Sequence, residues 1–285
     1  MKKFIKVMLI LAAVFFAAGL CFSVGGAAMG ATLKSVQVAD QIREWYHGFL
    51  DDDWEETEDR ISTEKDLETP SSQRGKEVYE YDSMDEAEVE LKYDAFYVEY
   101  HDQDNICVEV ENDPDNSVQV TMEGKKLKIQ SKTRKRKDRK VTLYLPKDSI
   151  LEKFSAEIGA GMVEFTEDFS AEDVEIQVGA GQVSNRGTLK AGTFEVEVGV
   201  GSAEIFGLDA RDIKGECGTG ELYLEMSGRE TDYGYQLKCG LGSITIGENE
   251  YFSLNRTRTL ENPGAEGRME LECGLGGIVV DFLEG

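Results

Sequence analysis

Residues 154–165 read FSAEIGAGMVEF, residues 174–185 read VEIQVGAGQVSN, and residues 194–205 read FEVEVGVGSAEI. The three segments align without a gap, and in each of them apolar and polar residues alternate on both sides of a Gly-x-Gly. Such alternation is the period of a β-strand with one buried face, and glycines suit a sharp corner between two strands. Each segment is therefore predicted to form a strand, a Gly-x-Gly corner and a second strand.

The same unit recurs along the chain, with Gly-x-Gly at Gly159/Gly161, Gly179/Gly181, Gly199/Gly201, Gly218/Gly220, Gly240/Gly242 and Gly274/Gly276. The residues five, three and one positions before the first glycine are apolar in every copy except for Gly215, and those between them are polar. One unit cannot bury its apolar side, whereas copies stacked about 4.8 Å apart can bury it against their neighbours. We therefore predict an all-β fold, a β-solenoid or β-roll of stacked rungs in sequence order. A β-sandwich of hairpins is the alternative, but it would not require near-constant spacing.

Three of the five cysteines fall in one column of this alignment. Cys217, Cys239 and Cys273 take the place that Ile158, Val178 and Val198 hold in the other copies. We interpret them as small buried hydrophobic residues. Neighbouring rungs would bring Cα atoms within the range for a disulfide, so a Cys217–Cys239 bond remains an alternative.

Patterns that would indicate chemistry are weak. A dinucleotide-binding loop requires a third glycine and a following helix, whereas strand residues follow these corners. The two histidines, His47 and His101, are too few and too scattered for a histidine metal site or a base–nucleophile relay. We predict no catalytic residue, no cofactor and no metal, so the chain is not expected to be an enzyme.

The N-terminus favours a membrane segment within residues 1–35. Lysines at positions 2, 3 and 6 precede Val7–Leu33, which contains no charged residue. That run exceeds the roughly 20 residues needed to cross a bilayer, and the lysines should stay in the cytoplasm. The expected localisation is the cell membrane, with a single N-terminal transmembrane helix and the bulk of the chain extracytoplasmic. Small residues at Ala28–Ala31 keep a cleaved signal peptide open as the alternative.

Residues 36–77 are expected to separate this segment from the β-repeat domain at residues 78–285. Apolar and aromatic residues between Val36 and Leu50 suggest a short juxtamembrane helix. The stretch from Asp51 to Lys76 is acidic and poor in apolar residues, as is typical of a solvated linker.

Charge decides which partners are plausible. The chain carries 56 acidic and 31 basic residues, a net charge of −25, which disfavours binding to nucleic acid. One basic island runs from Lys125 to Lys140. It is either a solvated hairpin loop or a docking patch for an anionic envelope polymer or lipid headgroups. The candidate patch residues are Lys132, Arg134, Lys135, Arg136, Lys137, Arg139 and Lys140.

From Tyr93 to Phe282 the chain resembles the bacterial β-strand-repeat proteins of unknown function that are catalogued under the name "putative adhesins". The resemblance lies in Leu143-Tyr144-Leu145-Pro146, the successive Gly-x-Gly rungs, Thr231-Asp232-Tyr233-Gly234-Tyr235, the long segment Gly247–Arg268 and the closing Gly274-Leu275-Gly276-Gly277-Ile278. It implies an N-terminal membrane segment followed by an extracytoplasmic stack.

These observations favour a non-catalytic structural or interaction module at the cell envelope. One alternative is a membrane regulator of an envelope-stress system that binds another membrane protein. A polysaccharide-acting β-helix enzyme is the other alternative, but the outward columns contain no convergent group of acids with an arginine.

Overall fold

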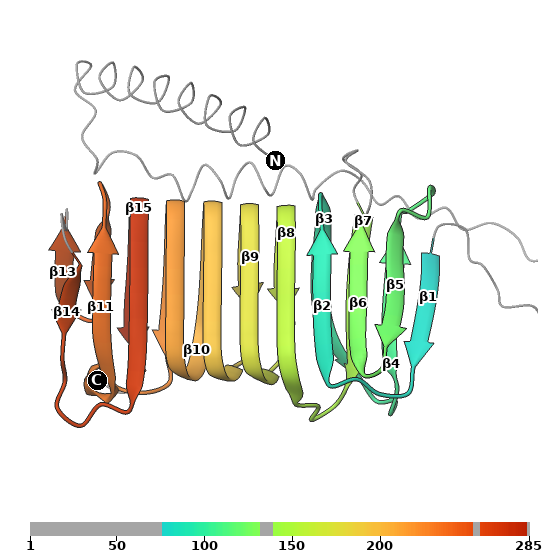
Figure 1. Cartoon of the computed structure of the whole chain (residues 1–285), viewed down its shortest axis with the longest axis horizontal. Helices are drawn as coiled ribbons and strands as arrows, with labels where there is room; N and C mark the ends of the chain where they lie inside the picture. Colours follow the sequence, from blue (N-terminus) through green and yellow to red (C-terminus); the bar gives the residue numbers. More distant parts are fainter. Residues whose placement is uncertain (1–75, 132–138, 253–256, 284–285) are drawn as a thin grey trace, which may run out of the picture. The chain divides into compact units, whose positions relative to one another are not determined.

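A computed structural model describes residues 76–131, 139–252 and 257–283, which form a 15-stranded all-β arrangement (Figure 1). The expected membrane segment and nearly all of the expected linker lie outside these residues. Among the described residues, no helix is long and apolar enough to cross a membrane. The strands are β1 (Lys76–Tyr81), β2 (Glu86–Leu91), β3 (Asp94–His101), β4 (Ile106–Glu111), β5 (Val118–Glu123), β6 (Lys126–Ser131), β7 (Arg139–Pro146), β8 (Leu151–Phe165), β9 (Phe169–Asn185), β10 (Leu189–Met226), β11 (Tyr233–Cys239), β12 (Ser243–Ile246), β13 (Asn249–Phe252), β14 (Arg258–Leu260) and β15 (Gly267–Phe282).

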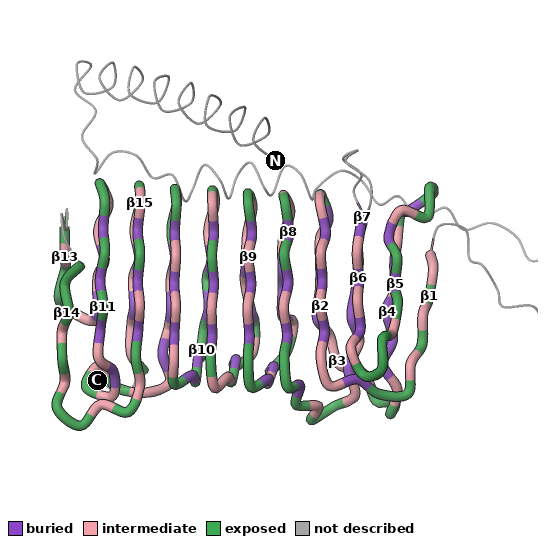
Figure 2. Tube along the Cα trace, viewed as in Figure 1, coloured by how far each residue is buried: buried purple, intermediate pink, exposed green. Residues whose placement is uncertain are grey.

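The predicted stack is present. Strands β8, β9 and β15 are each one rung and β10 contains two, and every rung turns back at its Gly-x-Gly corner. Adjacent rungs pair in parallel and in the predicted register, so that Ile158 lies beside Val178 and Val178 lies beside Val198. Each rung has a first leg, the strand segment before its corner, and a second leg, the segment after it. The first legs form one layer and the second legs form another, with the apolar columns buried between the two layers (Figure 2).

The corner glycines are required by the close approach of neighbouring rungs. At Gly181 the backbone has φ +146°, and a Cβ atom would lie 1.7 Å from the carbonyl oxygen of Gly161. The later rungs repeat this contact, with Gly220 packed on Gly201. No side chain fits in this space, so glycine sets both the corner and the spacing of the rungs.

The rungs do not all follow one another in sequence order, which corrects our expectation. Strand β15 lies between β10 and the rung made by β11 and β12. The outer side of β12 is taken by its hairpin partner β13, and the outer side of β11 is covered by β14. Only the side of that rung that faces β10 remains free for strand pairing, and β15 pairs there. The long segment from Gly247 to Arg268 lets β15 reach this position.

The other end of the stack has the same inversion. Strands β2 and β3 pair with β8, while β6 and β7, which come later in the chain, lie outside them. Antiparallel strands then complete this end: β5 pairs with β6, β4 with β7, and β1 with β4. Both ends are thus closed by short antiparallel strands, which limits pairing with other chains at open sheet edges.

The three cysteines of the repeat are buried, as predicted. Because β15 lies between β10 and β11, the order in which they stack differs from their order in the sequence. Cys273 lies between Cys217 and Cys239, in register with both. These cysteines are free thiols, and the alternative Cys217–Cys239 disulfide is wrong because β15 separates the two residues. Burial, followed by the nearby Cys239 and Cys217, raises the pKa of the Cys273 thiol to about 12.

Candidate functional site: the two faces of the stack

The legs that precede the corners present what we call the charged face. None of its described residues is aromatic, and most carry a charge. In stacking order they are Lys126, Lys128, Gln130, Glu86, Glu88, Glu90, Lys153, Ser155, Glu157, Asp173, Glu175, Gln177, Thr193, Glu195, Glu197, Asp212, Lys214, Glu216, Arg268, Glu270, Glu272, Gln236 and Lys238.

Ion pairs between rungs neutralise part of this face. The Lys214 ammonium lies 2.5 Å from a Glu195 carboxylate oxygen and 2.9 Å from one of Glu216. Hydrogen bonds to these two carboxylates raise the pKa of Lys214. At the far rung, Lys238 contacts Glu272 at 2.5 Å. Many of the charges on this face are therefore matched by other residues of the same face.

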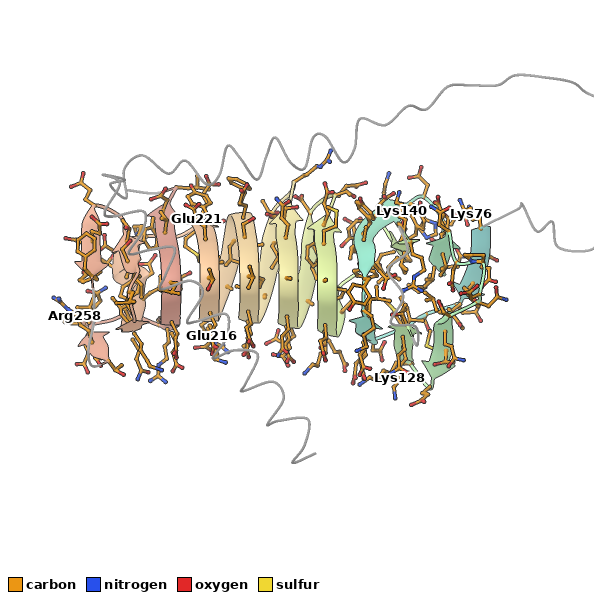
Figure 3. The ribbon with its side chains drawn as sticks, turned by 90° about the horizontal axis from the view of Figure 1, so that it is seen from above. Lys76, Lys128, Lys140, Glu216, Glu221 and Arg258 are labelled. Atoms are coloured by element: carbon orange, nitrogen blue, oxygen red, sulfur yellow. The ribbon has the colours of Figure 1, made fainter. Side chains whose placement is uncertain are left out.

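The legs that follow the corners present a different surface, which we call the aromatic face. Figure 3 shows the opposition of the two faces, with Glu216 and Lys128 on one side and Glu221 and Lys140 on the other. Hydroxyl, amide, aromatic and apolar side chains are common on the aromatic face. Its residues are Lys140, Tyr144, Ala95, Tyr97, Glu99, Met162, Glu164, Gln182, Ser184, Arg186, Ser202, Glu204, Phe206, Glu221, Tyr223, Glu225, Gly277, Val279, Asp281, Ser243 and Thr245.

One aromatic group on this face lies in the middle of the stack, on β10. The rings of Phe206 and Tyr223 have centroids 5.5 Å apart, and Phe206 is 39% exposed. The Tyr223 hydroxyl donates to Asp281 at 3.1 Å. Burial and this hydrogen bond raise the pKa of Tyr223 to about 12. The buried Asn185 side chain bonds both the amide and the carbonyl of Phe206 at 2.8 Å, which fixes the backbone under the exposed ring.

A second aromatic group lies on β3 and β7. The Tyr97 hydroxyl donates to the Met162 sulfur at 3.6 Å, and the Lys140 ammonium lies 4.7 Å from the centroid of the Tyr97 ring. The Tyr144 ring lies 5.9 Å from that of His101. Both aromatic groups escaped the sequence analysis, although the strand period after each corner already places Tyr97, Phe206 and Tyr223 in outward columns.

The structure divides the candidate basic patch. Lys132, Arg134, Lys135, Arg136 and Lys137 lie outside the described residues, and Lys140 lies over Tyr97. Arg139 is only 1% exposed, so its assignment to a docking surface is wrong. Arg139 lies in register with Asp94, at the position that the corner glycines hold in the other rungs. Inside the fold, the carboxylates of Asp94 and Asp113 offset its charge.

Arg139 belongs to a buried polar cluster at the last corner of the stack. Its Nε donates to Asp94 at 2.5 Å and its Nη1 donates to Ser117 at 2.5 Å, with Asp113 3.6 Å from Nη1. Burial alone would raise the pKa of the Asp113 carboxyl. Hydrogen bonds from Ser117 and Val118, together with the Arg139 charge, instead lower that pKa below its ordinary value.

A shallow groove of about 640 Å³ lies at the return turns, where the chain crosses from β7 to β8. Charges of both signs line it, including Lys147, Arg186, Asp148 and Asp168. Arg186 also forms part of the aromatic face, so the groove adjoins that face. Within residues 76–131, 139–252 and 257–283, no group of three or more His, Cys, Asp or Glu side chains could hold a metal ion.

Comparisons with solved structures give low sequence identities. The chain is similar to a "putative cell adhesion protein" from Clostridium sporogenes, with 11% identity, 73% of this chain and 98% of that chain covered, and a TM-score of 0.41. It is also similar to a "putative adhesin" from Bacteroides fragilis, with 15% identity, coverages of 73% and 98%, and a TM-score of 0.33. A "putative lipid binding protein" from Parabacteroides distasonis has 16% identity, coverages of 73% and 97%, and a TM-score of 0.31.

No curated protein matches the chain at a significant level. The Toastrack DUF4097 family profile matches residues 83–225, which include strands β2 to β9 and most of β10. These strands contain the first four Gly-x-Gly corners and the inverted rungs at the β6–β7 end. The chain therefore belongs to the Toastrack DUF4097 family.

Proposed function

We propose that this protein is a non-catalytic interaction module of the cell envelope and that the aromatic face is the side that meets the partner. The observation that carries the proposal is the difference between two faces built by the same rungs. The backbone of each rung dictates which residues point outward, but it does not require aromatic residues on one side and charged residues on the other.

The composition of the aromatic face suits an interface. Binding surfaces are enriched in Tyr, Phe and Met and depleted of Lys, Glu and Asp. Phe206, Tyr223, Tyr97 and Met162 lie on this face, whereas the charged face has no described aromatic residue and consists mostly of charged side chains, some of them ion-paired. Desolvating that charged face would be costly, because its ion pairs would lose their water.

The sequence supports a position at the membrane. The uncharged run Val7–Leu33 is long enough to span a bilayer, and the preceding lysines favour a cytoplasmic N-terminus. An anchor would hold the stack near the surface and raise its effective concentration there. The basic segment, with Lys132, Arg134, Lys135, Arg136 and Lys137, adds a possible contact for an anionic polymer or for lipid headgroups.

The experiment adds the same charge to each face in turn. Full-length protein in vesicles would be mixed with cell envelopes of the source organism, and the fraction retained would be measured by co-sedimentation. We expect Phe206→Glu to abolish retention, because it places a charge in the aromatic group. Thr193→Glu, on the charged face, should leave retention unchanged. Equal retention of the two variants would contradict the proposal.

A further inference from the structure

The two aromatic groups lie along the direction in which the rungs stack. Strand β3, which holds Tyr97, is separated by β8 and β9 from the first rung of β10, which holds Phe206. Three rung steps correspond to about 14 Å at the usual strand spacing of about 4.8 Å. A ligand that contacts both groups must therefore be extended.

The surface between the two groups is polar. Gln182, Ser184 and Ser202 provide amide and hydroxyl groups. The Arg186 Nε donates to Glu164 at 2.6 Å, and the exposed Glu204, two residues before Phe206, adds a carboxylate that can accept hydrogen bonds. The strip thus has aromatic rings at both ends and hydrogen-bonding side chains, neutral and charged, in the middle.

A sugar ring has matching chemistry, because one face presents C–H groups and the rim presents hydroxyls. An exposed aromatic ring packs against the C–H face, and amide, hydroxyl and ammonium groups bond the rim. Phe206 presents an exposed ring on a fixed backbone, while the Lys140 ammonium, which lies over the Tyr97 ring, is placed to donate to a hydroxyl.

We propose that the aromatic face binds a neutral glycan chain laid along the stack, with the Phe206–Tyr223 pair as its main stacking platform and the Lys140–Tyr97 pair as a second contact. This inference rests on the proposed function and names the class of ligand. The net charge of −25 disfavours a polyanionic glycan or a nucleic acid. A protein partner usually contacts one central cluster of anchor residues, whereas here two platforms lie several rungs apart.

The test uses full-length protein in detergent and measures binding by calorimetry. The probes are two neutral hexasaccharides, cellohexaose and chitohexaose, and the anionic hexagalacturonate. We expect saturable binding of at least one neutral hexamer that depends on Phe206, whereas any binding of hexagalacturonate to the basic segment should not depend on Phe206. Leucine variants keep an apolar side chain but lose the ring, so Phe206→Leu should weaken binding about three- to tenfold, the range of an aromatic contact. Tyr97→Leu should have a smaller effect.

The control is Thr193→Leu on the charged face, which should leave affinity unchanged, and melting temperatures report whether each variant is folded. The inference is overturned if no neutral hexamer binds, if Phe206→Leu weakens hexagalacturonate binding as much as it weakens neutral hexamer binding, or if folded Phe206→Leu binds the neutral hexamer as well as the parent. If envelope retention still depends on Phe206 in that case, the ligand class is wrong and the proposed face stands. If retention does not depend on Phe206 either, both proposals fail.

Discussion

The charged face and the aromatic face are made by the same rungs, one from the legs before each corner and the other from the legs after it. On the charged face, Lys214 bridges Glu195 and Glu216. On the aromatic face, the same β10 strand presents Phe206 and Tyr223 as a ring pair. The repeat fixes which way each residue points and leaves its chemical type free. The direction in which the side chains point therefore does not explain why the two faces differ in composition.

The largest expected effect comes from removing the corner that gives the faces their common register. Gly181→Ala would place a methyl group 1.7 Å from the carbonyl oxygen of Gly161. We expect the free energy of unfolding to fall by more than about 4 kcal/mol, or the variant not to fold. Urea denaturation measures this free energy. Gly277→Ala is the control, because a Cβ there meets nothing within 4 Å and should change stability little.

The second largest loss of stability is expected at the end of the stack, where Arg139 is a buried charge rather than part of an exposed face. Arg139→Ala leaves Asp94 and Asp113 buried without their cation. Removing one partner of a buried ion pair costs about 3–5 kcal/mol. Thermal unfolding would show the loss, and Lys140→Ala, next in sequence, serves as the control with a partly exposed side chain. Equal effects of the two variants would contradict the assignment of Arg139 to the interior.

The same cluster predicts a pH dependence. The pKa of Asp113 is lower in the folded protein than its ordinary value, so its charged form stabilises the fold. This contribution is fully present above about pH 4 and is lost as the pH falls through the folded pKa. The stability difference between the parent and Asp113→Asn, measured by urea denaturation, should shrink below about pH 4. If the stability difference between the parent and Asp113→Asn stays constant down to pH 2, the charged Asp113 carboxylate does not stabilise the fold.

The smallest effect is expected on the charged face. Lys214→Gln removes two contacts between partly exposed side chains, which typically contribute about 0–1 kcal/mol. The change in melting temperature should be small and should decrease further in 1 M salt, because salt screens exposed pairs. A large loss that salt does not reduce would mean that this face contributes more to the fold than its exposure indicates.

How much was predictable depends on the residues concerned. The alternation around each Gly-x-Gly predicted the register of Ile158, Val178 and Val198, because a strand has only two sides. The order of the last three rungs was not predictable from the alignment of the repeats. Cys217, Cys239 and Cys273 occupy equivalent positions in these rungs, so the alignment does not show which rung lies in the middle. The outer sides of β12 and β11 are taken by β13 and β14. The long spacing between Gly240 and Gly274 shows that residues are inserted there, but it does not show on which side of the rung the last strand lies.

The candidate site was harder to predict for a related reason. Arg139 lies in a run of basic residues, and only its register with Asp94 reveals that it is buried. Phe206 and Tyr223 become conspicuous only when the columns of the second legs are compared with those of the first. That signal was present in the sequence, but the Gly-x-Gly alignment drew attention to the first legs.

The order of the rungs decides which residues are neighbours on both faces, and cysteine cross-linking tests it directly. In the structure Glu216 is in register with Glu272, and Glu272 with Lys238. Neighbouring Cα atoms are then about 4.8 Å apart, within disulfide range, while Glu216 and Lys238 are about twice as far apart. In the folded protein, oxidised glutathione should link the double variant Glu216→Cys/Glu272→Cys but not Glu216→Cys/Lys238→Cys, as read by peptide mass spectrometry. Efficient linking of the second pair and not the first would show that the rungs follow sequence order and would contradict the stack described above.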